Sequence, residues 1–157
     1  MPDDSATRLT HVIHAPRAAV YRALLDPAAV QQWMVPDGMT SEIHSFDPRE
    51  GGAFRISLTY DEPTDTGKTS DRTDTYHGRF TRLVPDTEVV QVVEFETDDP
   101  GMQGEMTITY RLRDVDGGTE VEGRHDDLPP ALSREDNDLG WRLSIAKLAA
   151  LVEAEAG

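Results

Sequence analysis

The residue best suited to acid–base chemistry in this sequence is His125, which ends a stretch that alternates apolar and polar residues. In a strand it shares a face with Val121 and Gly123, because side chains two positions apart point to the same side. A neutral imidazole facing an apolar interior can exchange a hydrogen bond with a ligand or act as a base. The alternative is a structural histidine whose hydrogen bonds are satisfied near the end of the sheet.

Three tyrosines could add to this chemistry. Tyr60, Tyr76 and Tyr110 each lie in a stretch with strand-like alternation. Their hydroxyl groups could orient a ligand while their rings supply apolar contact area.

A run of carboxylates follows another apolar stretch and comprises Glu94, Glu96, Asp98 and Asp99. The simplest interpretation is the solvated end of a strand. Glu94 or Glu96 buried beside Arg111 would be different, because buried pairs have shifted pKa values and can do acid–base work. The sequence leaves both interpretations open.

Arg49 is the cation of most interest, since it lies in the glycine-rich turn Asp47–Gly52. Its guanidinium group could brace the turn by bonding carbonyl groups. It could also guard a pocket mouth and pair with an anionic head group.

The sequence does not predict a metal site or a nucleophile. His11 and His14 fall on opposite faces of a strand, and no HxH or HExxH spacing occurs. There is no cysteine and no G-x-S-x-G motif. Ser133, with Asp136 three residues later, resembles a helix capping box. We therefore expect neither a metal ion nor a cofactor.

Composition restricts the partners and the location. Thirty acidic residues against 15 basic ones give a net charge of -15. This charge repels phosphate backbones and anionic membrane surfaces, so we expect no nucleic-acid partner. No apolar run approaches the roughly 20 residues that span a bilayer, so no membrane insertion is expected. The absence of cysteine and a polar, acidic N-terminus favour a cytoplasmic location.

Hydrophobic periodicity predicts one strand, two short helices, a run of strands and a long terminal helix. The first strand spans Thr7–His14, and helices are predicted at Arg17–Leu25 and from Asp26-Pro27 to Met34. Further strands are predicted at Ser41–Phe46, Ala53–Tyr60, Thr75–Leu83, Glu88–Thr97, Gly104–Arg113 and Thr119–Asp127. The polar segment Asp61–Asp74 is predicted to be a long hairpin loop.

The terminal helix is predicted from Ser133 to about Ala154. Its apolar residues form two neighbouring rows at helical spacing. One row comprises Leu139, Leu143, Ala146 and Ala150, and the other comprises Trp141, Ile145, Leu148 and Val152.

This order of elements predicts an α+β fold in a single domain of residues 1–157, with residues 1–6 as a flexible tail. A curved antiparallel sheet of six to seven strands should wrap around the long C-terminal helix. The two short helices after strand one should cover part of the same face. A curved sheet and a straight helix differ in shape, so we expect an apolar cavity between them.

The side chains expected to face this space are the candidates for lining a ligand cavity. They are Phe54, Ile56, Leu58, Tyr76, Phe80, Phe95, Met106, Ile108, Tyr110, His125, Trp141, Ile145 and Leu148. Gly78 and Gly123 fall on the same face and could leave a void, or could instead mark bulges that bend the sheet. The alternative for the whole set is an ordinary core, since burying each large side chain stabilises by roughly 1.5–3 kcal/mol.

Six short motifs follow one another along the chain. They are Pro16 with Val20 and Leu24, Trp33-Met34-Val35-Pro36, Asp47–Gly52, Gly78 with Leu83, Gly118-Thr119 leading to His125, and Gly140-Trp141 with Leu148. With these motifs the chain resembles the helix-grip superfamily of START-like, birch-pollen-allergen-like, polyketide cyclase and lipid transport proteins. Within it, the chain is similar to homologues of the activator of the heat-shock-protein-90 ATPase, over nearly its whole length.

The resemblance implies the helix-grip fold and a binding or accessory role. We prefer a non-catalytic domain that binds a small apolar or amphipathic ligand. A second hypothesis is a cyclase- or hydrolase-like enzyme that uses His125, Tyr110 or a buried glutamate. A third is a chaperone-interacting accessory protein with an exposed apolar patch around Trp33 and Met39. Homodimer formation stays open.

Overall fold

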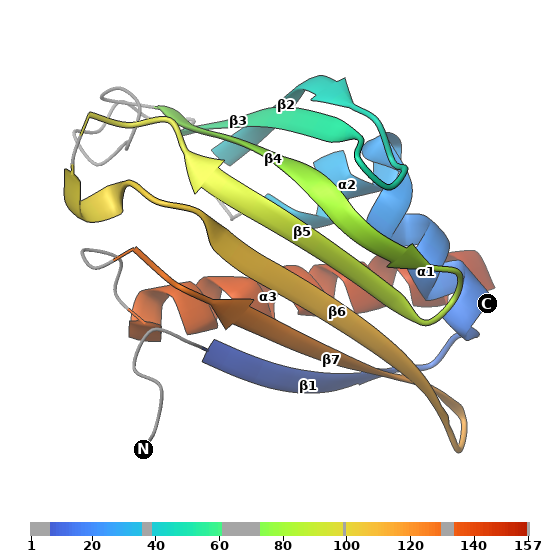
Figure 1. Ribbon diagram of the computed structural model, residues 1–157. Coiled ribbons are helices and arrows are strands. Elements are labelled where there is room, and N and C mark those ends of the chain that lie inside the picture. Colours follow the sequence, from blue (N-terminus) through green and yellow to red (C-terminus); the bar gives the residue numbers. More distant parts are fainter. Residues whose placement is uncertain (1–6, 36–38, 61–72, 99, 130–133, 157) are drawn as a thin grey trace.

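Seven antiparallel strands form one continuous sheet in the order β1-β7-β6-β5-β4-β3-β2 (Figure 1). The computed structural model describes residues 7–35, 39–60, 73–98, 100–129 and 134–156. The strands are β1 (Thr7–Ile13), β2 (Met39–Phe46), β3 (Ala53–Tyr60), β4 (Thr73–Val84), β5 (Glu88–Phe95), β6 (Met106–Val115) and β7 (Gly118–Asp126). From β2 to β7, each strand pairs with the next one along the chain, which makes this part of the sheet a meander.

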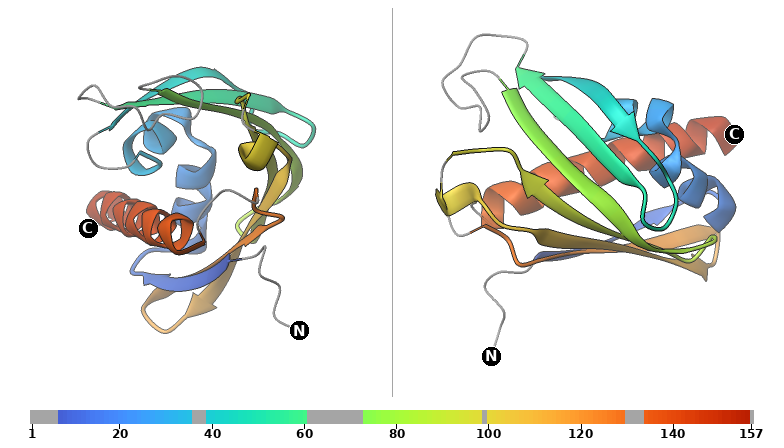
Figure 2. Two further views of the ribbon diagram at one scale, coloured as in Figure 1. Left: turned by 90° about the vertical axis from the view of Figure 1, so that its left-hand side faces the viewer. Right: turned by 45° about the horizontal axis from the view of Figure 1, so that its top comes forward.

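The helices all lie inside the curve of this sheet. They are α1 (Arg17–Leu25), α2 (Pro27–Trp33) and the long α3 (Arg134–Ala156), with a short 3-10 turn η1 (Pro100–Met102) before β6. Viewed along α3, the sheet bends around the helix, and α1 and α2 close the side next to β2 (Figure 2). This is the predicted helix-grip architecture. None of the helices in the described ranges is long and apolar enough to cross a membrane.

Local sequence explains how the chain enters this arrangement. Asp26 begins α2, because its Oδ1 accepts a hydrogen bond from the backbone N–H of Ala28 at 3.0 Å and Pro27 follows at the first helical position. The sheet bends at two register shifts, one between Ile43 and Ser45 and one between Phe80 and Arg82. Such bulges increase local twist and curve a sheet.

The predicted boundaries hold to within a few residues. Strand β4 begins at Thr73, so Thr73 and Asp74 belong to the sheet and not to the loop predicted for Asp61–Asp74. Residues 61–72, the proposed tail 1–6 and Ser133 with its proposed capping role lie outside the described residues.

One of the two apolar rows on α3 does not face the sheet. Trp141, Ile145, Leu148 and Val152 are buried. In contrast, Leu139 is 59% exposed and Leu143 is 53% exposed. The reason is geometric, because a helix lying on a sheet buries only one stripe, and the adjacent row turns towards solvent.

Candidate ligand site between the helix and the sheet

The predicted cavity residues meet on the concave face of the sheet and the buried stripe of α3. Phe54 lies opposite Gly78, and Ile56 lies opposite Tyr76, which in turn lies opposite Phe95. Eleven of the thirteen candidates are buried, and Leu58 and Phe95 are partly buried against the same core. The structure therefore brings all of them to one interior. Their role in holding a ligand stays a prediction.

Aromatic rings fill the part of this interior under β2, β3 and β4. The centroids of Phe54 and Phe80 are 5.2 Å apart, and Phe46 meets Phe80 edge-on at 5.6 Å. The ring of Tyr76 meets Phe54 edge-on at 6.4 Å. Edge-to-face contacts at these distances are favourable, so this end is a packed aromatic core.

The two interior glycines make room for rings. A Cβ atom at Gly123 would lie 2.5 Å from Cζ2 of Trp141. One at Gly78 would lie 2.3 Å from the carbonyl oxygen of Val92 and 2.7 Å from Cζ of Phe54. The hypothesis that these glycines leave voids is therefore wrong, because an aromatic ring occupies each position.

His125 points inward as predicted and lies against α3. Its ring stacks on the indole of Trp141, with the centroids 3.6 Å apart and the planes 23° from parallel. Its Nδ1 lies 2.8 Å from Nδ2 of Asn137, one turn before Trp141 on α3. Burial lowers the pKa of His125 to about 3, because low-dielectric surroundings disfavour the imidazolium ion. His125 is therefore neutral at physiological pH.

Three buried polar atoms in the described part of the chain have no hydrogen-bond partner. They are Nε2 of His125, Nε1 of Trp141 and Oγ of Ser41. Trp33 provides the contrast, because its indole N–H donates to the carbonyl of Ala23 at 3.0 Å. An unsatisfied buried polar group costs roughly 1–3 kcal/mol, so three on one interior surface require an explanation.

The unpartnered atoms belong to buried residues of the concave sheet face and of the buried stripe of α3. Ser41 lies opposite Leu58 on the concave face, where its backbone carbonyl accepts a hydrogen bond from Gln31 of α2. His125 and Trp141 stack at the opposite side of the sheet, where β7 meets α3. Two sides of the same interior therefore carry unused hydrogen-bonding capacity.

The buried tyrosines remain neutral phenols. Burial raises the pKa of Tyr110 to about 12, although the nearby indole N–H of Trp141 opposes this rise, and burial also raises the pKa of Tyr76. The hydroxyl of Tyr76 donates to Sδ of Met34 at 3.1 Å. The ring of Tyr110 meets Trp141 edge-on at 6.2 Å. The side chain of Tyr60 lies outside the described residues.

Three residues at this site were not predicted from the sequence. Asp74 is buried and shares the concave face with Tyr76, two positions away on β4. Asn137 bonds His125, and Ser41 contributes an unpartnered hydroxyl. The alternation Asp74, Tyr76, Gly78 could have revealed the first. Asn137 and Ser41 gain their positions only when α3 and β2 meet the rest of the sheet.

The carboxylates proposed for acid–base work lie elsewhere. Arg111 bonds Glu88 at 2.9 Å, and not Glu94 or Glu96. Glu96 accepts two hydrogen bonds from Arg55, at 2.8 and 2.9 Å. These bonds lower the pKa of Glu96 to about 2, which is the wrong direction for a general acid. The prediction of a buried Glu94 or Glu96 beside Arg111 is therefore wrong. Arg111 instead pairs with Glu88, and Glu96 pairs with Arg55.

The exposure of Arg49 and Trp33 decides two other predictions. The side chain of Arg49 is 79% exposed, and its Nε donates to Oδ2 of Asp47 at 2.7 Å. It braces its own turn. Trp33 is only 1% exposed, so it contributes no surface to the apolar patch proposed around Trp33 and Met39.

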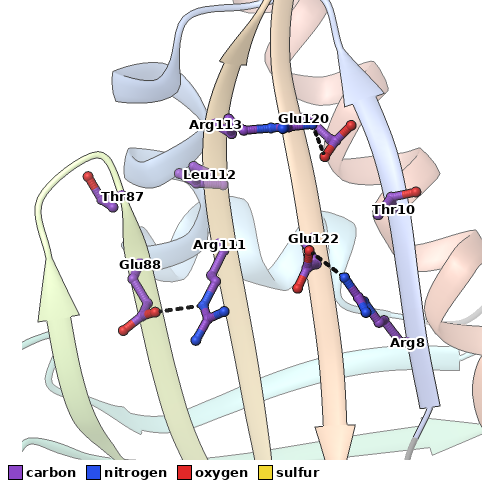
Figure 3. Close-up of a pocket in the computed structure, with 9 residues that line it drawn as sticks. All are labelled: Arg8, Thr10, Thr87, Glu88, Arg111, Leu112, Arg113, Glu120 and Glu122. Atoms are coloured by element: carbon purple, nitrogen blue, oxygen red, sulfur yellow. Dashed lines mark hydrogen bonds and ion pairs between the residues drawn. The ribbon is translucent and has the colours of Figure 1, made fainter.

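A groove of about 670 Å³ crosses the convex face of the sheet (Figure 3). Cross-strand ion pairs line it, and they are Arg8–Glu122 at 2.9 Å, Arg113–Glu120 at 2.8 Å and Arg111–Glu88 at 2.9 Å. Because the charges of both signs are already paired, the groove offers no concentrated field to a charged ligand.

The sequence from residue 14 to residue 153 matches the family described as "Activator of Hsp90 ATPase homolog 1-like protein". The chain belongs to this family. Among curated proteins none matches it in sequence. Family membership and the helix-grip fold together identify a domain of the ligand-binding type, similar to homologues of the Hsp90 ATPase activator.

Solved structures agree with this assignment. Protein CV1439 from Chromobacterium violaceum is 33% identical, with a TM-score of 0.84 over 95% of this chain and 97% of that one. A Rhodobacter sphaeroides protein is 21% identical, with a TM-score of 0.79 over 98% and 97%. A Staphylococcus epidermidis protein is 15% identical, with a TM-score of 0.78 over 100% and 94%. The last two likenesses concern the fold alone.

Proposed function

We propose that this member of the Hsp90-ATPase-activator-like family binds a small amphipathic molecule between α3 and the concave face of the sheet. One observation carries the proposal: the unpartnered polar atoms of Ser41, His125 and Trp141 all belong to buried residues of the interface between the helices and the sheet. A ligand site combines an apolar wall with a few polar groups that fix orientation. Aromatic rings supply the wall, and these three atoms supply the polar groups.

The chemistry of His125 favours binding over catalysis. Its Nδ1 is engaged with Asn137, and its pKa of about 3 makes it a weak base at neutral pH. The best general base has a pKa near the working pH. A hydrogen-bonding role for His125 therefore fits the geometry better than the cyclase- or hydrolase-like alternative.

Native mass spectrometry of the purified protein tests the proposal directly. We expect an additional mass on the folded chain that disappears on denaturation. Where nothing co-purifies, the neutral aromatic probes 2-acetylnaphthalene and 2-ethylnaphthalene can be titrated while the two indole N–H resonances are followed by NMR.

The two tryptophans provide an internal control in this titration. We expect the Trp141 resonance to shift, since its N–H has no partner, and the Trp33 resonance to stay in place, since its N–H is bonded to Ala23. Absence of a co-purified molecule together with unchanged resonances for both probes would exclude a small-molecule site here.

A further inference from the structure

The hydrogen bond between Asn137 and His125 determines where the imidazole carries its proton. The Nδ2 atom of Asn137 lies 2.8 Å from Nδ1 of His125 and 3.4 Å from Oγ1 of Thr7. An amide nitrogen only donates hydrogen bonds, so Nδ1 is the acceptor. A neutral imidazole with an accepting Nδ1 has its proton on Nε2. The unpartnered atom of His125 is therefore a donor.

Trp141 places a second donor on the same pair of stacked rings. The indole nitrogen can only donate. It lies near the hydroxyl of Tyr110, where it opposes the rise in pKa that burial causes, but it has no partner at hydrogen-bonding distance and angle. The two rings hold each other in place through their 3.6 Å stack, and Asn137 fixes the orientation of the imidazole. Two buried donors on one pair of stacked rings stay unsatisfied until an acceptor reaches them.

The charges around the interior favour a neutral acceptor. His125 stays uncharged, and the buried carboxyl residue Asp74 belongs to the same concave face. The ammonium group of Lys147, on α3, donates to the carbonyl of Val35. Burying an anion beside neutral donors costs several kcal/mol, whereas a neutral carbonyl oxygen loses much less hydration.

We propose that the ligand is a neutral apolar molecule with a carbonyl-type oxygen, which accepts hydrogen bonds from Nε2 of His125 and Nε1 of Trp141. This inference rests on the proposed function and names the chemistry of the ligand. Ketones, aldehydes, esters and amides fit it. Pure hydrocarbons leave both donors unsatisfied, and carboxylates lose more hydration free energy than two neutral donors return.

A matched set of probes tests this inference. The compounds 2-acetylnaphthalene, 2-ethylnaphthalene and 2-naphthoate share a ring and differ in presenting a ketone, a hydrocarbon or an anion. In a purely apolar pocket the hydrocarbon binds tightest, because the ketone loses its hydrogen bonds with water. With two buried donors available we expect the ketone to bind about tenfold tighter than the hydrocarbon, and the anion to bind weakest, by calorimetry.

Three variants test whether the preference for the ketone depends on the N–H groups of His125 and Trp141. His125→Phe and Trp141→Phe each remove one donor and keep an aromatic ring, so the preference for the ketone should fall towards unity. Trp33→Phe is the matched control, because it removes an indole N–H that is already bonded to Ala23. It should leave the preference of the wild-type protein unchanged.

The nitrogen-15 shifts of the His125 ring in the wild-type protein give a readout that does not depend on variants. A proton on Nε2 supports the inference, and a proton on Nδ1 overturns it. A hydrocarbon that binds as tightly as the ketone also overturns it, and leaves the proposed function standing. If no probe binds and nothing co-purifies, the proposed function itself fails.

Discussion

The backbone of Gly123 lies directly against the indole of Trp141, so that a β-carbon at residue 123 would be 2.5 Å from Cζ2 of the ring. Real Cβ atoms do not approach other atoms this closely. The indole stacks on His125, two residues further along β7. The indole of Trp141 on α3 thus packs against Gly123 and His125, which share one face of β7.

Replacing Gly123 by alanine should destabilise the fold by about 1–3 kcal/mol, because overpacking displaces Trp141 from His125. Urea denaturation measures the loss, and near-ultraviolet circular dichroism reports the displaced indole. Gly140→Ala is the control, since a β-carbon there meets nothing within 4 Å. In a helix interior it should stabilise by about 0.5–1 kcal/mol. Equal stability of Gly123→Ala and the parent would contradict the close contact.

Stability should fall with decreasing pH because of His125. Burial lowers its pKa from 6.5 to about 3 in the folded chain. Between these values the unfolded chain binds a proton that the folded chain does not, so unfolding becomes easier as the pH decreases. The loss amounts to about 1.4 kcal/mol per pH unit, or about 2 kcal/mol between pH 6.5 and 5.

The comparison for this pH effect is His125→Gln, which cannot take up that proton. Denaturation curves at a series of pH values should show a steeper loss for the wild-type chain than for the variant over this window. Parallel curves would mean that the imidazole is protonated in the folded state as easily as in the unfolded one.

Two neighbouring apolar residues of α3 should respond very differently to truncation. Ile145 is fully buried under the sheet, whereas Leu143 is 53% exposed. Ile145→Ala should lower the free energy of unfolding by about 2–5 kcal/mol, because it leaves a cavity. Leu143→Ala should change it by less than about 1 kcal/mol. Similar losses at both positions, measured in the same denaturant series, would place the Leu143 row against another surface in solution.

The convex face offers a test of its ion pairs. Glu88 accepts from Arg82 at 2.8 Å and from Arg111 at 2.9 Å, and its side chain is only 15% exposed. Glu88→Gln should cost about 1 kcal/mol at low salt. The cost should shrink in 1 M NaCl, where the screening length is about 3 Å.

Glu105 is the matched position for this test, because it pairs with Arg79 at 2.8 Å but its side chain is 56% exposed. Glu105→Gln should have almost no effect on stability at either salt concentration. A loss at Glu88 that is independent of salt would point to packing of the glutamate stem as the main contribution.

The fold was predictable because each element carries its own periodic signal. Alternation along Ala53–Tyr60 and helical spacing of Trp141, Ile145 and Leu148 are local properties, and short turns force consecutive strands to pair. The boundaries at Thr73 and Asp74 were missed, because a polar residue on an inward face looks like a loop residue when the neighbouring strand is unknown.

The sequence by itself determined the order of the elements, the inward direction of His125 and the family. Only the tertiary structure decided which row of α3 is buried, that Gly78 and Gly123 accommodate rings, and that Asn137 directs the proton of His125. These outcomes depend on which side chains meet across the helix–sheet interface. Asn137 contacts residues 12 and 130 positions away in the sequence, and contacts at such separations produce no periodic pattern that could be recognised beforehand. The unsatisfied N–H groups of His125 and Trp141 are such an outcome, and the proposed function rests on them.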